Sequence, residues 1–129
     1  MVEKYIHGRE LTVTVLGKKA YPIVEIKPSH ELYDYECKYT PGMSQYICPA
    51  ELDEELTKSI QEDTELIFGK LDCDVYARAD FLLDEIGDHY FLEMNTLPGM
   101  TSTSLVPKSV NAAGMSFDEL IKKIIELSL

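Results

Sequence analysis

Apolar and polar residues alternate along two neighbouring segments near the amino end of the chain, residues 10–17 and 19–27. A period of two residues is typical of β-strands that bury one face. Gly17 falls between the segments, where a tight turn favours glycine, so together they predict a β-hairpin. A short apolar segment at 46–50 predicts a further strand.

Alternation returns in residues 74–84 and 89–95, "DVYARADFLLD" and "HYFLEMN". The residues between them include Gly87, which favours a turn, so this pair predicts a second hairpin. One face of 74–84 carries only valine, alanine, phenylalanine and leucine, and we expect that face to be buried.

Helical periodicity marks the rest of the chain. Residues 53–69 repeat apolar side chains near one face, with Asp53 as a candidate N-cap and Gly69 as a stop signal. Residues 104–114 predict a short helix that ends at Gly114.

The last predicted helix begins with the capping box of Ser116 and Glu119, and Met115 and Leu120 occupy the positions of a hydrophobic staple. An apolar stripe follows, made of Phe117, Leu120, Ile121, Ile124 and Ile125. The elements together predict an α+β fold, a mostly antiparallel sheet with helices packed on one face.

Residues 28–45 break these patterns, with proline, serine, glycine, charged residues and several tyrosines in no clear period. A loop of this length inside a compact domain is usually functional or disordered. The tyrosines argue against disorder, because they would have something to pack on.

Composition narrows the class of protein. The 129 residues suffice for a single domain, 1–129. A net charge of −11 without a basic patch argues against nucleic acid or an anionic membrane as partners. The charged start of the chain does not resemble a signal peptide, and three cysteines without a CxxC pattern fit a reducing, cytoplasmic compartment.

The second hairpin brings two acids together. When it is folded about the bond between residues 86 and 87, Asp80 faces Glu93, Arg78 faces Asn95, and residue 84 faces residue 89. Directly opposed side chains lie with Cβ atoms about 5 Å apart, so two carboxylates there repel each other. In this register Tyr90, Leu92 and Met94 share the buried face, opposite to Phe91, Glu93 and Asn95.

Three arrangements would relieve the repulsion between Asp80 and Glu93: one acid keeps its proton, Arg78 neutralises the pair, or a divalent cation lies between them. The amide oxygen of Asn95 on the same face favours the cation, and Mg²⁺ is commonly held by a few carboxylates plus substrate phosphates. The alternative is an exposed hairpin face with a salt bridge from Arg78 to Asp80 or Glu93.

The strand at 89–95 is followed by Pro98 and Gly99, which end a ladder and permit a sharp turn. Four hydroxyl side chains at 101–104 then precede the short helix. Backbone N–H groups at a helix N-terminus suit a carboxylate or an oxyanion, although one of these hydroxyls could simply cap the helix.

The segment "ARADFLLDEIGDHYFLEMNTLPGMTSTSLVPKSVNAAGMSFDELI" closely resembles the C-terminal part of bacterial D-alanine–D-alanine ligases, members of the ATP-grasp superfamily. "EKYIHGRELTV" resembles the nucleotide hinge of that family, and "YDYECKYTPGMSQYICPA" resembles its mobile loop over the active site. The resemblance extends from residue 2 to the last helix.

The resemblance implies roles for individual residues. Asp80, Glu93 and Asn95 would bind two Mg²⁺ ions, for which Mn²⁺ can substitute, and Arg78 with the N–H of Gly99 would stabilise an oxyanion. Ser104 and Leu105 would bind the carboxylate of the second D-alanine, and Tyr39 would close the loop over that substrate. The nucleoside would be bound by Glu3, Lys4, Ile6 and Glu10, and the phosphates by Lys38.

The implied activity is ligation of two D-alanines with ATP through an acyl phosphate, for peptidoglycan precursor synthesis, in a homodimeric parent enzyme. The chain starts at the hinge and has no glycine-rich phosphate loop, so we expect a C-terminal fragment that is inactive alone, without the N-terminal substrate domain and the first half of the ATP-binding region. Two alternatives remain: another ATP-grasp carboxylate–amine ligase, or a non-catalytic nucleotide- or metal-binding module.

Overall fold

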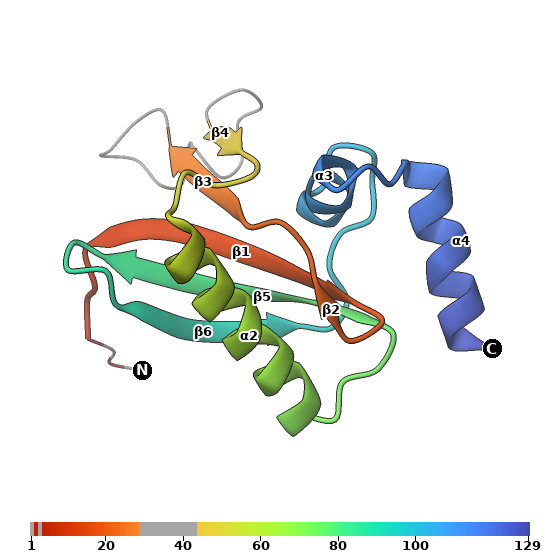
Figure 1. Cartoon of the computed structure of the whole chain (residues 1–129), viewed down its shortest axis with the longest axis horizontal. Helices are drawn as coiled ribbons and strands as arrows, with labels where there is room; N and C mark the ends of the chain where they lie inside the picture. Colours follow the sequence, from red (N-terminus) through yellow and green to blue (C-terminus); the bar gives the residue numbers. More distant parts are fainter. Residues whose placement is uncertain (1, 3, 29–43) are drawn as a thin grey trace.

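A computed structural model describes residues 2, 4–28 and 44–129 (Figure 1). Its strands form one sheet in the order β4-β3-β1-β5-β6, with β2 paired to the end of β1, and every pairing is antiparallel. The strands are β1 (Gly8–Leu16), β2 (Lys19–Ala20), β3 (Val24–Pro28), β4 (Ser44–Ile47), β5 (Tyr76–Asp84) and β6 (His89–Asn95). The two predicted hairpins are present, β1 with β2 and β3, and β5 with β6.

Three helices lie in the described part of the chain: α2 (Glu54–Lys70), α3 (Leu105–Ala112) and α4 (Phe117–Ser128). Asp53 caps α2, because its carboxylate accepts the N–H of Leu56. The predicted capping box is also present at α4, where Ser116 and Glu119 each bond the other's backbone N–H. None of these helices is long and apolar enough to cross a membrane.

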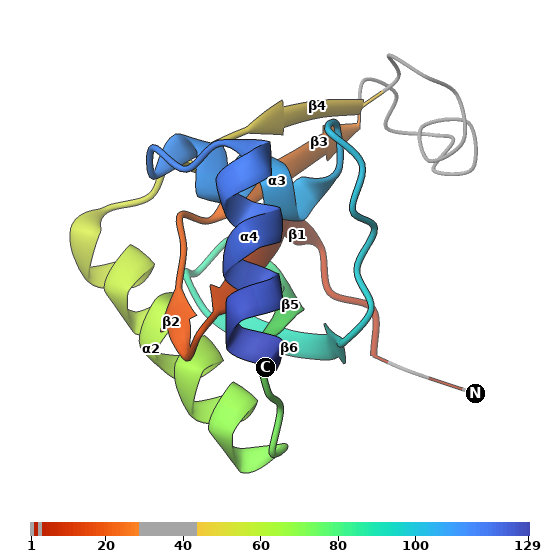
Figure 2. The same ribbon diagram turned by 90° about the vertical axis from the view of Figure 1, so that its right-hand side faces the viewer.

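The predicted α+β class with a mostly antiparallel sheet is confirmed, but the helices are divided between the two faces. Leu11 and Val13 of β1 pack beside Ile60 of α2. Leu16, which points to the opposite side of the same strand, packs beside Val106 of α3. Figure 2 shows α2 on one side of the sheet, with the segment that leads from β6 to α3 on the other.

The register of the second hairpin differs from the prediction beyond its acid pair. Asp80 is paired with Glu93 as expected, but Phe81 is paired with Phe91, and a β-bulge separates the two pairs. From there on His89 faces Leu83 rather than residue 84. The bulge reverses the two faces of β6, so the expectation that Tyr90 and Leu92 share the buried face with Met94 is wrong.

Phe91 lies instead on the α2 side of the sheet, where its ring meets the edge of Phe81 at a centroid distance of 5.7 Å. Met94, as predicted, packs against the core. The irregular segment predicted at 28–45 lies almost entirely outside the described residues.

Candidate functional site

The site lies on the sheet face opposite α2, where β1, β5 and β6 run side by side. Antiparallel pairing places Asp80 of β5 between Thr12 of β1 and Glu93 of β6. Arg78 faces Asn95 two pairs further along the hairpin, on the same face of the sheet. The structure therefore brings together the two acids, the arginine and the amide that the sequence singled out.

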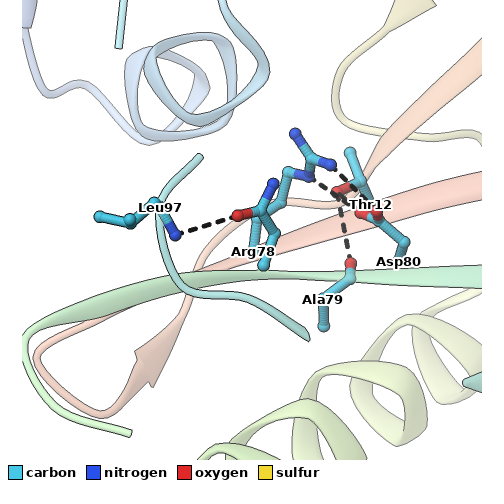
Figure 3. A network of polar contacts seen from close by, with 6 residues as sticks. Thr12, Arg78, Ala79, Asp80 and Leu97 are labelled. Atoms are coloured by element: carbon cyan, nitrogen blue, oxygen red, sulfur yellow. Dashed lines mark hydrogen bonds and ion pairs between the residues drawn. The ribbon is translucent and has the colours of Figure 1, made fainter. Parts of the chain in front are cut away.

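Asp80 accepts hydrogen bonds on both of its carboxylate oxygens (Figure 3). Arg78 donates from Nε to Oδ1 at 2.9 Å and from Nη2 to Oδ2 at 3.0 Å. Thr12 donates its hydroxyl to Oδ1 at 2.8 Å, and the carbonyl oxygen of Ala79 lies 3.3 Å from the same hydroxyl. This arrangement fixes the plane of the carboxylate relative to the sheet.

Arg78 is the positive centre of the site. The hydrogen bonds to Asp80 raise the pKa of Arg78 above its ordinary value, and the charges of Asp80, Glu93 and Glu10 raise it further against the opposing effect of burial. Its side chain is 19% exposed and that of Asp80 20% exposed, so water screens this pair only in part. The salt bridge from Arg78 to Asp80, which was part of the alternative to a metal site for this hairpin, is present.

The chain turns away from the sheet directly after Asn95. The amide oxygen of Asn95 accepts the N–H of Leu97 at 2.9 Å, which holds the side chain across the start of the turn. Glu93, two residues nearer the bulge, is exposed. Its carboxylate can therefore meet a ligand from solvent without displacing the packed core.

A tight loop precedes α3. The hydroxyl of Ser104 accepts the N–H of Thr101 at 3.0 Å and lies 2.8 Å from the hydroxyl of Thr101, and it does not cap α3. A side chain at Gly99 would bring its Cβ within 3.2 Å of that hydroxyl. Glycine therefore lets the backbone pass close to Ser104, while the N–H of Leu105 lies in the first turn of α3, where helical N–H groups have no helical acceptor.

The remaining candidate residues lie in or before β1, or outside the described residues. Glu10 lies on β1 on the same face as Asp80, and Lys4 and Ile6 precede β1. Glu3, Lys38 and Tyr39 lie outside the described residues, so their predicted roles stay predictions.

Sequence reasoning missed Thr12. A threonine in an alternating strand is ordinary, and its neighbour across the sheet is 68 residues away in the chain. The signal that could have found it is the pairing of β1 with β5, which the local hairpin patterns do not specify. Thr12 is 1% exposed, so its hydroxyl is committed to contacts inside the protein.

The oxygen donors on this face fit Mg²⁺. Two carboxylates and one amide oxygen are hard ligands of the kind that Mg²⁺ takes from a protein, and phosphates and water commonly complete its shell. In the described residues no group of three or more His, Cys, Asp or Glu side chains could hold a metal ion, so any cation here would depend on Asn95 and on further oxygens.

Solved structures of known proteins share this fold. A crystal structure of D-alanine–D-alanine ligase from Bacillus anthracis complexed with ATP superposes with a TM-score of 0.84 at 36% identity, covering 98% of this chain and 40% of that chain. The VanG D-Ala:D-Ser ligase from Enterococcus faecalis gives a TM-score of 0.80 at 34% identity over 98% of this chain and 38% of that chain. The fold is the C-terminal part of the ATP-grasp fold.

The family follows from the sequence. A family model described as "D-ala D-ala ligase C-terminus" matches residues 1–126, and the chain belongs to this family. It is 47% identical to the D-alanine–D-alanine ligase of Halalkalibacterium halodurans over 100% of this chain and 44% of that protein. It is 48% identical to that of Methylacidiphilum infernorum over 99% of this chain and 42% of that protein. The chain thus spans less than half the length of these relatives.

Proposed function

We propose that residues 1–129 supply the metal-binding and acceptor-binding part of an ATP-dependent D-alanine–D-alanine ligase of the cytoplasm, whose product enters peptidoglycan precursor synthesis. The observation that carries the proposal is the convergence of Asp80, Glu93 and Asn95 with Arg78 on one sheet face. The loop through Gly99 leaves that face for the N-terminus of α3.

The chemistry has two steps. The carboxylate of one D-alanine attacks the γ-phosphorus of ATP, which gives an acyl phosphate and ADP. The amine of the second D-alanine then attacks the acyl carbon, loses a proton, and expels inorganic phosphate from the tetrahedral adduct. Both steps depend on positioning and on neutralising negative charge more than on covalent help from the protein.

Each residue has a task in this scheme. Asp80, Glu93 and Asn95 hold two Mg²⁺ ions, which neutralise phosphate charge when bound. Arg78 and the N–H of Gly99 donate to the oxyanion of the tetrahedral adduct, and donors aimed at that oxygen commonly contribute about 3 kcal/mol each. Ser104 and the N–H of Leu105 bind the carboxylate of the second D-alanine.

The nucleotide residues complete the proposal. Glu3, Lys4 and Ile6 line the adenine pocket, Glu10 binds the ribose hydroxyls and Lys38 the phosphates. Tyr39 closes over the second substrate. We further propose that the parent enzyme is a homodimer, and that residues 1–129 form a single domain that is inactive without the substrate domain and the first half of the ATP-binding region.

A chimera tests the activity. Residues 2–129 replace the aligned part of the Halalkalibacterium halodurans relative, and phosphate release is measured with ATP, D-alanine and a panel of acceptors that includes D-serine and D-lactate. We expect D-alanine-dependent turnover that Glu93→Gln lowers by at least about 100-fold, since a ligand of a catalytic metal is lost.

The matched control is Glu62→Gln, which changes an exposed acid of α2 on the far side of the sheet and should leave turnover unchanged. Faster turnover with another acceptor than with D-alanine would mean that the second substrate is a different amine or hydroxy acid. A folded chimera without turnover on any acceptor would contradict the enzymatic proposal, and turnover by the isolated chain would contradict its inactivity.

A further inference from the structure

We infer that Thr12 is a positioning residue that determines which carboxylate oxygen Asp80 presents to the cation. The inference rests on the proposed metal role of the Asp80–Glu93 hairpin and extends it to a residue of another strand. Thr12 comes from β1, outside the hairpin that carries the other groups.

Counting lone pairs on Asp80 leads to this conclusion. An ionised carboxylate has about four acceptor positions, two on each oxygen. Oδ1 already accepts from the Thr12 hydroxyl at 2.8 Å and from Arg78 Nε at 2.9 Å. Oδ2 accepts only from Arg78 Nη2 among these donors, at 3.0 Å. The fourth position, on Oδ2, is therefore the one left for a cation, so Asp80 binds through one oxygen.

Thr12 and Arg78 differ in how firmly they hold this orientation. Arg78 gives two of its five N–H donors to Asp80 and is proposed to donate others to the reacting oxyanion, so a movement of its side chain toward that oxyanion would loosen its hold on Asp80. Thr12 is 1% exposed on the central strand, and its side chain has restricted χ1 freedom because it is β-branched. When Arg78 donates elsewhere, the Thr12 hydroxyl remains to keep the carboxylate in place.

Residues that hydrogen-bond to a metal ligand usually matter for metal affinity, because they orient the ligand before the metal binds. Without the hydroxyl, only the two Arg78 contacts orient the carboxylate, so Asp80 can rotate when Arg78 moves and no longer presents Oδ2 to the cation. Loss of such a partner typically weakens metal binding by about 10–100-fold.

The test measures Mn²⁺ binding by the isotope-labelled 129-residue chain, from paramagnetic broadening of amide signals, with and without ADP. In the unaltered chain broadening should be confined to the neighbourhoods of Asp80, Glu93 and Asn95. Thr12→Val, which keeps the shape and removes the hydroxyl, should need at least about 10-fold more Mn²⁺ for the same broadening. Thr12→Ser, which restores the hydroxyl, should bind within about twofold of the unaltered chain.

Thr64→Val is the matched control, because Thr64 is also buried but donates to the carbonyl of Ile60 within α2. It should leave Mn²⁺ binding unchanged. If Thr12→Val fails to fold, as judged by amide dispersion, Thr12→Ala removes the same hydroxyl without placing a methyl group beside the carboxylate.

The outcomes separate the two proposals. Localised broadening in the unaltered chain that is equally strong in the folded hydroxyl-free variant overturns the role of Thr12 and leaves the metal site standing. No localised broadening in the unaltered chain overturns the metal site, and the role of Thr12 with it.

Discussion

At the scale of single residues, the described part of the chain contains two arginine–carboxylate pairs with different surroundings. Arg9 donates from Nε and Nη2 to the two carboxylate oxygens of Glu25 at 2.9 and 2.7 Å, and its Nη2 also donates to the carbonyl of Glu51. The Glu25 side chain is 2% exposed. Leu11 faces Glu25 on the α2 side of the sheet, so this pair lies away from the Asp80 site and serves the fold.

Removing Arg9 should leave a buried carboxylate without its charge partner. We expect Arg9→Met to lower the free energy of unfolding by about 2 kcal/mol, less than for a fully buried pair because the Arg9 side chain is 38% exposed. Urea unfolding measures the change. Lys58→Met breaks an exposed pair with Glu62 at 3.9 Å and should change the same free energy by less than about 0.5 kcal/mol. Equal effects of the two substitutions would refute this account of Glu25.

The same pair predicts an acid dependence. The hydrogen bonds and charge of Arg9 hold the pKa of Glu25 below its ordinary value of 4.5, against the effect of burial. A depressed pKa adds stability above the unfolded value, and this stability is lost as the pH falls from about 4.5 through the folded pKa. The pKa of Asp84 is also lowered, mainly by the backbone N–H of Asp88, and acts in the same direction.

The urea concentration at the unfolding midpoint of the unaltered chain should therefore decrease when the pH is lowered below about 4.5. In Arg9→Met burial raises the pKa of Glu25 against only the weaker effect of the Lys27 charge, so protonation should favour the folded state and the loss on acidification should become smaller. A pH profile of Arg9→Met parallel to that of the unaltered chain would contradict the assignment to Glu25.

At the scale of elements, the sequence predicted each described helix and most strands, because their patterns are local. Caps and periodicity placed both ends of α2 and the start of α4 within a residue or two of where they lie. The bulge in β6 was not predicted, since no glycine marks it and a period of two simply extends through it. The acid pair was predicted correctly because Asp80 and Glu93 lie on the side of the bulge that keeps the expected register.

The apolar stripe of α4 was predicted as one surface, but its members are buried unequally. Leu120 is fully buried beside Val106 and Val110, whereas Ile125 is 56% exposed. We expect Leu120→Ala to cost about 3 kcal/mol of unfolding free energy, and Ile125→Ala less than about 1 kcal/mol. Thermal or urea unfolding of the two variants measures this difference, and losses of similar size would show that α4 packs along the whole stripe.

At the scale of the molecule, the two faces of the sheet have different coverings. On one face α2 packs over β1, and its side chains contact the core through Ile60 and Phe68. On the other face α3 and α4 pack around Leu16 at one end of the strands, beyond the Asp80 site. Contacts between distant segments, such as Thr12 with Asp80, follow from this assembly and not from any local pattern. They are therefore the part of the site that sequence could not supply.

The charge of the whole chain gives a last prediction. With a net charge of −11, the folded chain repels itself, and any salt should stabilise it by screening. A site at Asp80 and Glu93 adds a specific effect, because a ligand that binds only the folded state stabilises it by about 1.4 kcal/mol at ten times its dissociation constant. MgCl₂ should therefore raise the unfolding midpoint more than NaCl at equal ionic strength. The excess should vanish in Glu93→Gln and persist in Glu62→Gln, whose acid is exposed on α2. An excess that survives Glu93→Gln would mean that Mg²⁺ acts on the acidic surface as a whole, and that the hairpin alone does not hold the ion.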